Sequence, residues 1–316
     1  MGRRVVTFRR LGKHGRFANC LFQYAAMRIY ANEHFCDLQV PQWIGTELFG
    51  LNDTPVACHL PPYHEKNVDG TCLTQGIPPE GNELVNHDFC GYGQYHTAYY
   101  RRHCSFFRDL YRPVKSIRER LQPAVDRLRK PDATIIGLHL RAGDYGRLIF
   151  YRTPVEWYLD WLKNNWSEYQ NPVLFIAAED RKLVDRFAEY NPITAESLGT
   201  ELSTRPHANY SYLGPDRRMR DPWQMDFYPD FYLLSKCNVL LIPNSTFSFV
   251  AAMLAGSLQR CFRSNLPTQD FVEIDPWNAQ PLTHDLAEDW RHVPDVCLDE
   301  TAYWRRKGNG FEEILS

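Results

Sequence analysis

The segment 240–254 reads Leu-Leu-Ile-Pro-Asn-Ser-Thr-Phe-Ser-Phe-Val-Ala-Ala-Met-Leu, an apolar run, a small polar turn and a second apolar run. The first run predicts a buried strand and the second a buried helix. A strand that ends in Asn244, Ser245 and Thr246 and continues directly as a helix aims hydroxyls and free backbone N–H groups at one point. Such a turn can hold an anion without a metal ion, and we predict a phosphate site here.

Two further apolar strands, 134–140 and 173–178, are each followed by a helical pattern. Near the N-terminus, a short strand-like run at 5–8 precedes a helical pattern at 20–31. Before the helix after the 134–140 strand, Thr153, Pro154 and Glu156 predict a capping box with Thr153 as N-cap. Strands that alternate with helices in this way predict an α/β fold with a parallel sheet.

The length of 316 residues, with 44% hydrophobic residues, suits two domains of ordinary size. The sequence Lys-Pro-Asp at 130–132 interrupts a helical pattern and marks the boundary. We therefore expect an N-terminal domain over 1–130, a second domain over 131–285 and a C-terminal tail over 286–316 that packs against the body.

The formal net charge of -2 gives no field that favours nucleic acid as a partner. The N-terminal residues lack an apolar stretch long enough for a signal peptide or membrane anchor, so no membrane span is expected. The nine cysteines are an odd number and none forms a C-x-x-C pair, which favours reduced thiols. These features together favour a cytoplasmic protein.

The strand 134–140 runs directly into Arg141, Ala142, Gly143 and Asp144. Ligands of open α/β sheets bind at the carboxyl ends of the strands, so we expect Arg141 and Asp144 at a binding site. Arg141 could clamp a diphosphate together with the hydroxyls of the 244–246 turn. The alternative is an internal salt bridge from Arg141 to Asp144 or Asp180.

No D-x-D pair is present that would hold a divalent cation against nucleotide phosphates, and no Gly-Lys-Ser/Thr P-loop occurs. We therefore expect no metal site and no cofactor, and ATP-dependent phosphoryl transfer is disfavoured.

Four segments in this order resemble the motifs of the inverting α-1,2-fucosyltransferases, which are related to the protein O-fucosyltransferases and the α-1,6-fucosyltransferases. The segment 15–25, Gly-Arg-Phe-Ala-Asn-Cys-Leu-Phe-Gln-Tyr-Ala, resembles the N-terminal motif. The segment 91–94, Gly-Tyr-Gly-Gln, resembles a Gly-Tyr-x-Gln motif. The segment 139–145 resembles the His-x-Arg-Arg-Gly-Asp-Tyr motif, and 230–254 resembles the closing motif with Asn-Ser-Thr-Phe-Ser.

The resemblance implies a GT-B type fold, two Rossmann-like domains that face a cleft. It implies transfer of L-fucose from GDP-fucose to a glycan acceptor, with inversion, without metal and with α-1,2 linkage. Arg141 would bind the donor diphosphate, and Asp144 would be either the catalytic base or a structural partner of Arg141. The donor site would also include residues of both domains: Arg16, Asn19, His139, Asp180, Asp230, Ser245, Thr246 and Phe247.

Two positions depart from the family pattern. Ala142 stands where the family usually has a second Arg, and Ala18 replaces a usual Gly. The first departure keeps two alternatives open: a transferase with another GDP-sugar donor, and a non-catalytic protein that binds a sugar nucleotide or a glycan. From the residues alone, His139 on an apolar strand is more typical of a buried core histidine than of a ligand.

Overall fold

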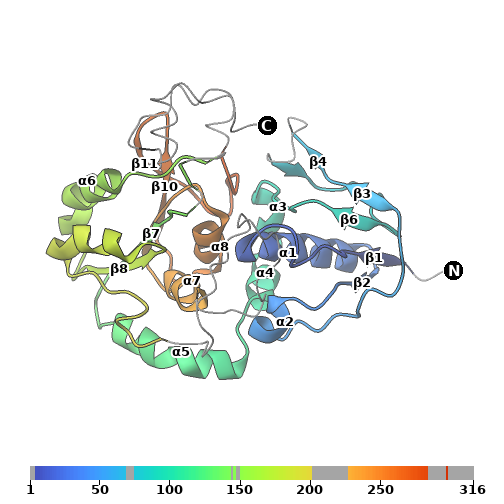
Figure 1. The fold of residues 1–316 in the computed structure, drawn as a ribbon, viewed down its shortest axis with the longest axis horizontal. Helices are drawn as coiled ribbons and strands as arrows, with labels where there is room; N and C mark the ends of the chain where they lie inside the picture. Colours follow the sequence, from blue (N-terminus) through green and yellow to red (C-terminus); the bar gives the residue numbers. More distant parts are fainter. Residues whose placement is uncertain are drawn as a thin grey trace. The chain divides into compact units, whose positions relative to one another are not determined.

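The computed structural model describes residues 4–68, 75–143, 145–146, 150–200, 227–283 and 297. The chain forms two compact units, each with its own parallel β-sheet and helices (Figure 1). The first unit contains Met1–Gln122 and Pro276–Leu282, and the second contains Pro123–Thr200 and Asp230–Asp275. The α/β fold expected from the alternation of strands and helices is confirmed.

The first unit contains a sheet of strand order β2-β1-β6-β3 in which every pairing is parallel. Its strands are β1 (Val5–Thr7), β2 (Asp37–Gln39), β3 (Pro62–His64) and β6 (Asp88–Cys90). The long helix α1 (Phe17–Glu33) connects β1 to β2, and the small hairpin of β4 (Lys66–Asn67) and β5 (Gly76–Ile77) follows β3. β1 therefore pairs with the next strand of the chain on one side and with β6 on the other.

Aromatic side chains form much of the core of the first unit. Tyr100 and Phe107 are fully buried and contact the ring of Phe22 on α1. They lie on the short helices α3 (Ala98–Arg101) and α4 (Cys104–Leu110), while α2 (Ile44–Phe49) follows β2. Burial of such rings is a large apolar contribution to stability, so these aromatics are core residues rather than a sugar-binding platform.

The second unit contains a sheet of order β11-β10-β9-β7-β8. Its strands are β7 (Ile135–Leu140), β8 (Val173–Ala178), β9 (Val239–Ile242), β10 (Arg260–Asn265) and β11 (Asp270–Glu273). The first four are mutually parallel, and β11 is antiparallel to β10. The helices are α5 (Lys115–Leu128, which begins in the first unit and includes Pro123), α6 (Val155–Asn165), α7 (Tyr228–Leu234) and α8 (Thr246–Leu254), with the 3-10 helices η1 (Trp166–Glu168) and η2 (Arg181–Tyr190).

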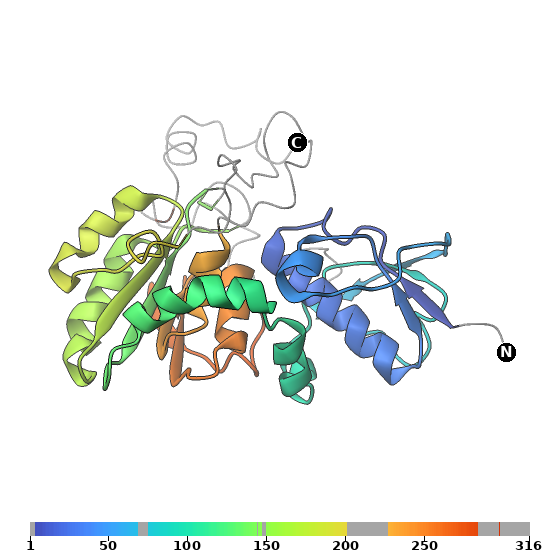
Figure 2. The same cartoon turned by 90° about the horizontal axis from the view of Figure 1, so that it is seen from below.

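The two faces of β7 are covered by different helices. Ile136, Leu138 and Leu140 belong to the core cluster that includes the apolar residues of α6. His139, on the opposite face, bonds to α8, and Figure 2 shows α6 and α8 on opposite sides of this sheet. The chain adds β8 on one side of β7 and then β9 on the other side. The order in which strands are added therefore reverses between β7 and β9, although these strands are parallel. In parallel α/β sheets a ligand crevice opens at such a switch point.

The predicted cap of α6 is wrong. The helix begins at Val155 with Pro154 as N-cap, and the hydroxyl of buried Thr153 donates to Ser264 Oγ at 2.9 Å. Tyr151 also bonds to Ser264 Oγ, at 2.8 Å. The sequence pattern placed Thr153 at the cap position, but a partner on β10, far away in the chain, satisfies its hydroxyl.

Candidate functional site

Arg141 leaves the end of β7, at the switch point of the second sheet. Its side chain is buried, and its guanidinium carbon lies 4.8 Å from the centroid of the Tyr145 ring. The Tyr145 hydroxyl donates to the carbonyl oxygen of Asn244 at 2.9 Å, which links the end of β7 to the turn after β9. A cation–π contact and a buried stem thus fix the guanidinium beside the hydroxyl turn.

Glu179 forms the ion pair with Arg141. Because Leu140 and Ala178 are paired in the parallel register of β7 and β8, Arg141 and Glu179 are the next residues on adjacent strands. Gly143 has φ +65°, and a Cβ at this position would lie 2.8 Å from Glu179 Oε2. Glycine therefore permits both the backbone turn and the approach of the carboxylate. Arg141 therefore does form an internal salt bridge, with Glu179 rather than with Asp180 in the contacts described. Asp144, the other partner considered from the sequence, lies outside the described residues.

The hydroxyl turn lies where the sequence predicted it, between β9 and α8. Ser245 is the N-cap residue in extended conformation, and within the described residues its side chain makes no capping hydrogen bond. Ser245 is buried, while Thr246 and Phe247 are partly exposed in the first turn of α8. The start of a helix presents backbone N–H donors and the positive end of the helix dipole, both favourable for an anion.

Asn244 holds this turn in place. Its buried side-chain amide donates to the carbonyl oxygen of Thr283 at 2.8 Å and accepts from the Thr283 N–H at the same distance. The sequence indicated Asn244 only as part of the turn, because its partner lies far along the chain.

His139 is a buried core residue, as its apolar strand suggested. Its Nδ1 lies 2.8 Å from Ser248 Oγ on α8, and its ring centroid lies 5.1 Å from that of Phe247. Burial lowers the pKa of His139 to about 3, so the imidazole is neutral at physiological pH. Within this unit His139 positions the start of α8 through Ser248 and Phe247.

Asp230 lies in the first turn of α7, next to Phe231, whose ring centroid is 5.3 Å from that of Phe247. Burial raises the pKa of Asp230 to about 7, although Arg181 opposes the shift. Asp230 Oδ2 lies 4.0 Å from Arg181 Nη2, and Oδ1 is buried without a hydrogen-bond partner among the described residues. An unsatisfied carboxylate oxygen is costly, so the site is suited to a ligand that donates hydrogen bonds.

Asp180, by contrast, has a local structural partner. It is the N-cap of η2, and its Oδ1 accepts from the Lys182 N–H at 3.0 Å. The residue is exposed. Asp144, the predicted base, falls outside the described residues.

Arg16 and Asn19 lie in the first unit, at the start of α1. Asn19 Oδ1 accepts from Gln94 Nε2 at 2.9 Å, so the first two family-like motifs are in direct contact. Gly15 has φ +83°, and a Cβ there would lie 2.7 Å from the Asn19 side chain. The glycine of the motif therefore permits the close approach of Asn19.

No protein-family model matches this chain, and no curated protein matches its sequence. Solved structures match its fold. A crystal structure of the α-1,6-fucosyltransferase NodZ soaked with GDP-fucose superposes with a TM-score of 0.52 at 14% identity, covering 87% of this chain and 99% of that one. Fucosyltransferase NodZ from Bradyrhizobium gives 0.55 at 15%, with the same coverage. A mutant FUT1 of Arabidopsis thaliana in complex with GDP gives 0.52 at 11%, covering 94% and 82%.

The chain has the GT-B fold of these fucosyltransferases. The expected GT-B type with two Rossmann-like domains is thereby confirmed. Because the neighbours include an α-1,6-fucosyltransferase, the fold does not distinguish the α-1,2 linkage. Within the described part of the chain, no helix is long and apolar enough to cross a membrane.

Proposed function

We propose that this protein transfers L-fucose from GDP-fucose to a hydroxyl group of a glycan, with inversion, without a metal ion and with α-1,2 linkage. One observation carries the proposal: buried Arg141 and the start of α8 meet at the switch point of a sheet whose fold is shared with structures that hold GDP or were soaked with GDP-fucose. The linkage and the inversion rest on the motif resemblance.

The proposed chemistry follows the charge that develops during transfer. The bond between the fucose anomeric carbon and the β-phosphate oxygen breaks, a bond to the acceptor oxygen forms, and GDP leaves with increased negative charge. Arg141 and the N–H and hydroxyl groups at the start of α8 would stabilise that charge. Asp144 is the proposed base that takes the proton of the acceptor hydroxyl, with the alternative that it is only a partner of Arg141.

Glu179 is the group that a diphosphate would have to share with Arg141. A guanidinium has five N–H donors, so it can bond a carboxylate and a phosphate together. The side chain of Glu179 is 42% exposed, against 8% for Arg141. The carboxylate can therefore turn towards solvent at small cost while Arg141 stays in place.

Asp230 is the proposed contact to the guanine base. Guanine presents adjacent N–H donors on one edge, and a carboxylate with a buried, unpartnered oxygen is their natural complement. The contacts of Phe231 and His139 with Phe247 connect this carboxylate to the start of α8, where the diphosphate is proposed to bind.

A second candidate is a non-catalytic protein that binds GDP-fucose or a glycan. Two observations favour it: Ala142 stands where the family has a second Arg, and the remaining Arg141 is already paired with Glu179. A transferase with another GDP-sugar is the other alternative.

The test combines calorimetric titration of GDP and several GDP-sugars with an assay of GDP release in the presence of a glycan panel. Acceptor-dependent GDP release from GDP-fucose, unchanged by EDTA, with an α-1,2 product by NMR, is the expected result. Tight GDP-fucose binding without release would favour the binding protein. Turnover of a different GDP-sugar would show that this sugar nucleotide, and not GDP-fucose, is the donor. Failure to bind GDP would overturn the nucleotide site.

A further inference from the structure

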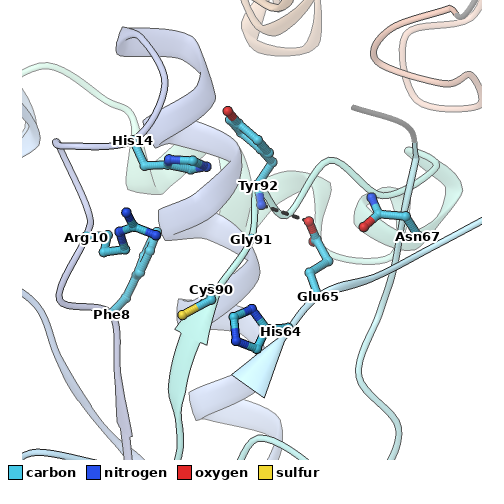
Figure 3. A pocket seen from close by; sticks show the side chains of 9 residues that line it. All are labelled: Phe8, Arg10, His14, His64, Glu65, Asn67, Cys90, Gly91 and Tyr92. Carbon is cyan, nitrogen blue, oxygen red and sulfur yellow. Dashed lines mark hydrogen bonds between the residues drawn. The ribbon is translucent and has the colours of Figure 1, made fainter. Parts of the chain in front are cut away.

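A cavity lies entirely within the first unit, where its parallel strands end (Figure 3). Its volume is about 310 Å³, at the lower end of the range of small-ligand pockets. Three segments line it, each at or just beyond the end of a strand. They are Phe8, Arg10 and His14 after β1; Cys90, Gly91 and Tyr92 from the last residue of β6; and His64, Glu65 and Asn67 from the last residue of β3 into β4.

The position of this cavity follows the same topological rule as the site in the second unit. β1 pairs with β2 on one side and with β6 on the other, so the switch point of the first sheet lies between β1 and β6. The cavity opens at the carboxyl ends of these two strands and of β3, which is parallel to β6. Ligands of open α/β sheets bind at such a place.

Glu65 is the fixed acceptor of the cavity. Its two carboxylate oxygens accept from the backbone N–H groups of Tyr92, at 2.8 Å, and Gly93, at 2.9 Å. A Cβ at Gly91 would lie 2.4 Å from Glu65 Cβ, and a Cβ at Gly76 would lie 2.6 Å from Glu65 Oε1. Two glycines thus permit the close approach of this side chain. Each carboxylate oxygen retains a lone pair for a ligand.

The opposite wall supplies donors and a ring surface. The guanidinium of Arg10 lines the cavity, and no ion pair to it occurs among the described residues. The rings of His14 and Tyr92 lie 4.5 Å apart between centroids, and Figure 3 shows them adjacent. Burial and the charge of Arg10 both lower the pKa of His14, which keeps its imidazole neutral near pH 7. The wall therefore presents one cation beside two neutral rings.

We propose that this cavity binds a sugar residue through Glu65, Arg10 and the His14–Tyr92 ring pair. A hydroxyl group can donate to Glu65 and accept from Arg10, and the face of a pyranose can lie against a ring. Glu65 already accepts two backbone N–H groups and has lone pairs left for ligand groups that donate, which sugar hydroxyls supply in number, whereas the oxygens of a phosphate mainly accept. An apolar ligand would use neither the remaining lone pairs of Glu65 nor the N–H donors of Arg10. A neutral ligand with several hydroxyl groups can bond to Glu65 and to Arg10 and can contact the His14–Tyr92 ring pair at the same time.

The place of this sugar in the reaction rests on the proposed function. If the second unit binds GDP-fucose, the sugar in the first unit belongs to the glycan acceptor. The binding of a sugar residue by the cavity does not itself require that the second unit binds a nucleotide, so the two claims can fail separately.

The test uses the full-length protein without nucleotide. Saturation-transfer NMR and calorimetry are recorded with methyl galactoside, methyl glucoside, N-acetylglucosamine and lactose, and with inorganic phosphate as the contrasting anion. At least one sugar is expected to bind and phosphate is not. Binding of phosphate in preference to every sugar, or of none of the probes, would overturn the proposal.

Two variants locate the binding. Arg10→Gln replaces an exposed charged side chain by a neutral one and is expected to weaken sugar binding at least tenfold. Glu65→Gln is expected to weaken sugar binding at least as much. Arg112→Gln is the matched control, because Arg112 is 66% exposed and pairs only with nearby Asp109 in the contacts described. An unchanged sugar affinity in Arg10→Gln, with the protein folded by circular dichroism, would overturn the assignment even where Glu65→Gln fails to fold.

GDP titration of the same samples separates this inference from the proposed function. Sugar binding that is lost in Arg10→Gln, in a protein that binds no GDP, would support the sugar site and contradict the nucleotide site. GDP binding without binding of any sugar would support the nucleotide site and contradict the sugar site.

Discussion

The two sheets have a candidate site at the same topological position, but a buried Arg dominates one candidate site and a largely buried carboxyl group the other. At the ends of β7 and β9 stand a buried cation, Arg141, and a helix start whose N-cap residue, Ser245, makes no side-chain cap hydrogen bond in the described part of the chain. In the first unit the corresponding groups are Glu65, which follows β3 beside β6, and Arg10, which follows β1. If both candidate sites bind as proposed, the backbone topology sets where each ligand lies, and the side chains near the strand ends set which kind of ligand it is.

The largest expected effect comes from removing the cation of the second site. Arg141→Ala is expected to lower kcat/KM for transfer by about 10²–10³, because a donor aimed at developing charge contributes this much. Arg260→Ala is the matched control: it breaks the exposed ion pair to Glu273 at the opposite, amino-terminal end of β10. Near-wild-type turnover in Arg141→Ala would remove the contrast between the two sites.

Two asparagine side chains, Asn244 at the turn of the second unit and Asn19 on α1 of the first unit, differ in burial, and so should the loss of stability when each is removed. Asn244→Ala removes the two hydrogen bonds that the buried Asn244 makes with the backbone of Thr283, and it is expected to lower the free energy of unfolding by about 2–3 kcal/mol. Asn19→Ala removes a partly buried bond to Gln94 and is expected to lower it by about 1 kcal/mol. Urea denaturation of both variants measures the difference, and a larger loss for Asn19 would reverse this ranking.

Each site also holds a carboxyl whose pKa burial raises to about 7, Glu65 in the first and Asp230 in the second. Asp230 binds its proton more tightly in the folded chain than in the unfolded chain, where its pKa is 3.8. Its contribution to stability is therefore complete below pH 3.8 and is lost as the pH rises through 7.

Asp230→Asn has no such titration, so its stability relative to the wild type should grow by on the order of 2 kcal/mol between pH 5 and pH 8. Urea denaturation at these two pH values measures the gap. A gap that does not change with pH would show that the carboxylate is charged and satisfied, unlike the buried oxygen described above.

The site in the second unit was largely predictable from sequence, because its parts follow apolar strands directly. Arg141 and the turn at Ser245 lie at the strand ends that their patterns predicted. Glu179 has the same signal, as the first residue after β8, but the register of β7 with β8 was needed to show that it, and not Asp180, faces Arg141.

The cavity of the first unit could not be predicted in this way. Glu65 lies in the segment 36–90, which has no clear hydrophobic period, between short strands. Its surroundings come from Gly76, Gly91 and the N–H groups of Tyr92 and Gly93, which are distant in sequence. Thr153 shows the same limit, since its hydroxyl bonds to Ser264 instead of capping a helix.

The smallest expected effect tests how far Glu179 weakens the anion site. Glu179→Gln removes a negative charge that competes with a diphosphate for Arg141, and it keeps the size of the side chain. Because Glu179 is 42% exposed and screened by solvent, GDP is expected to bind only about three- to tenfold tighter, or about 1 kcal/mol. Calorimetric titration of GDP measures the change, with Glu273→Gln as the control at the far end of the sheet. Weaker binding of GDP would mean that Glu179 orients Arg141 for the ligand and does not compete with it.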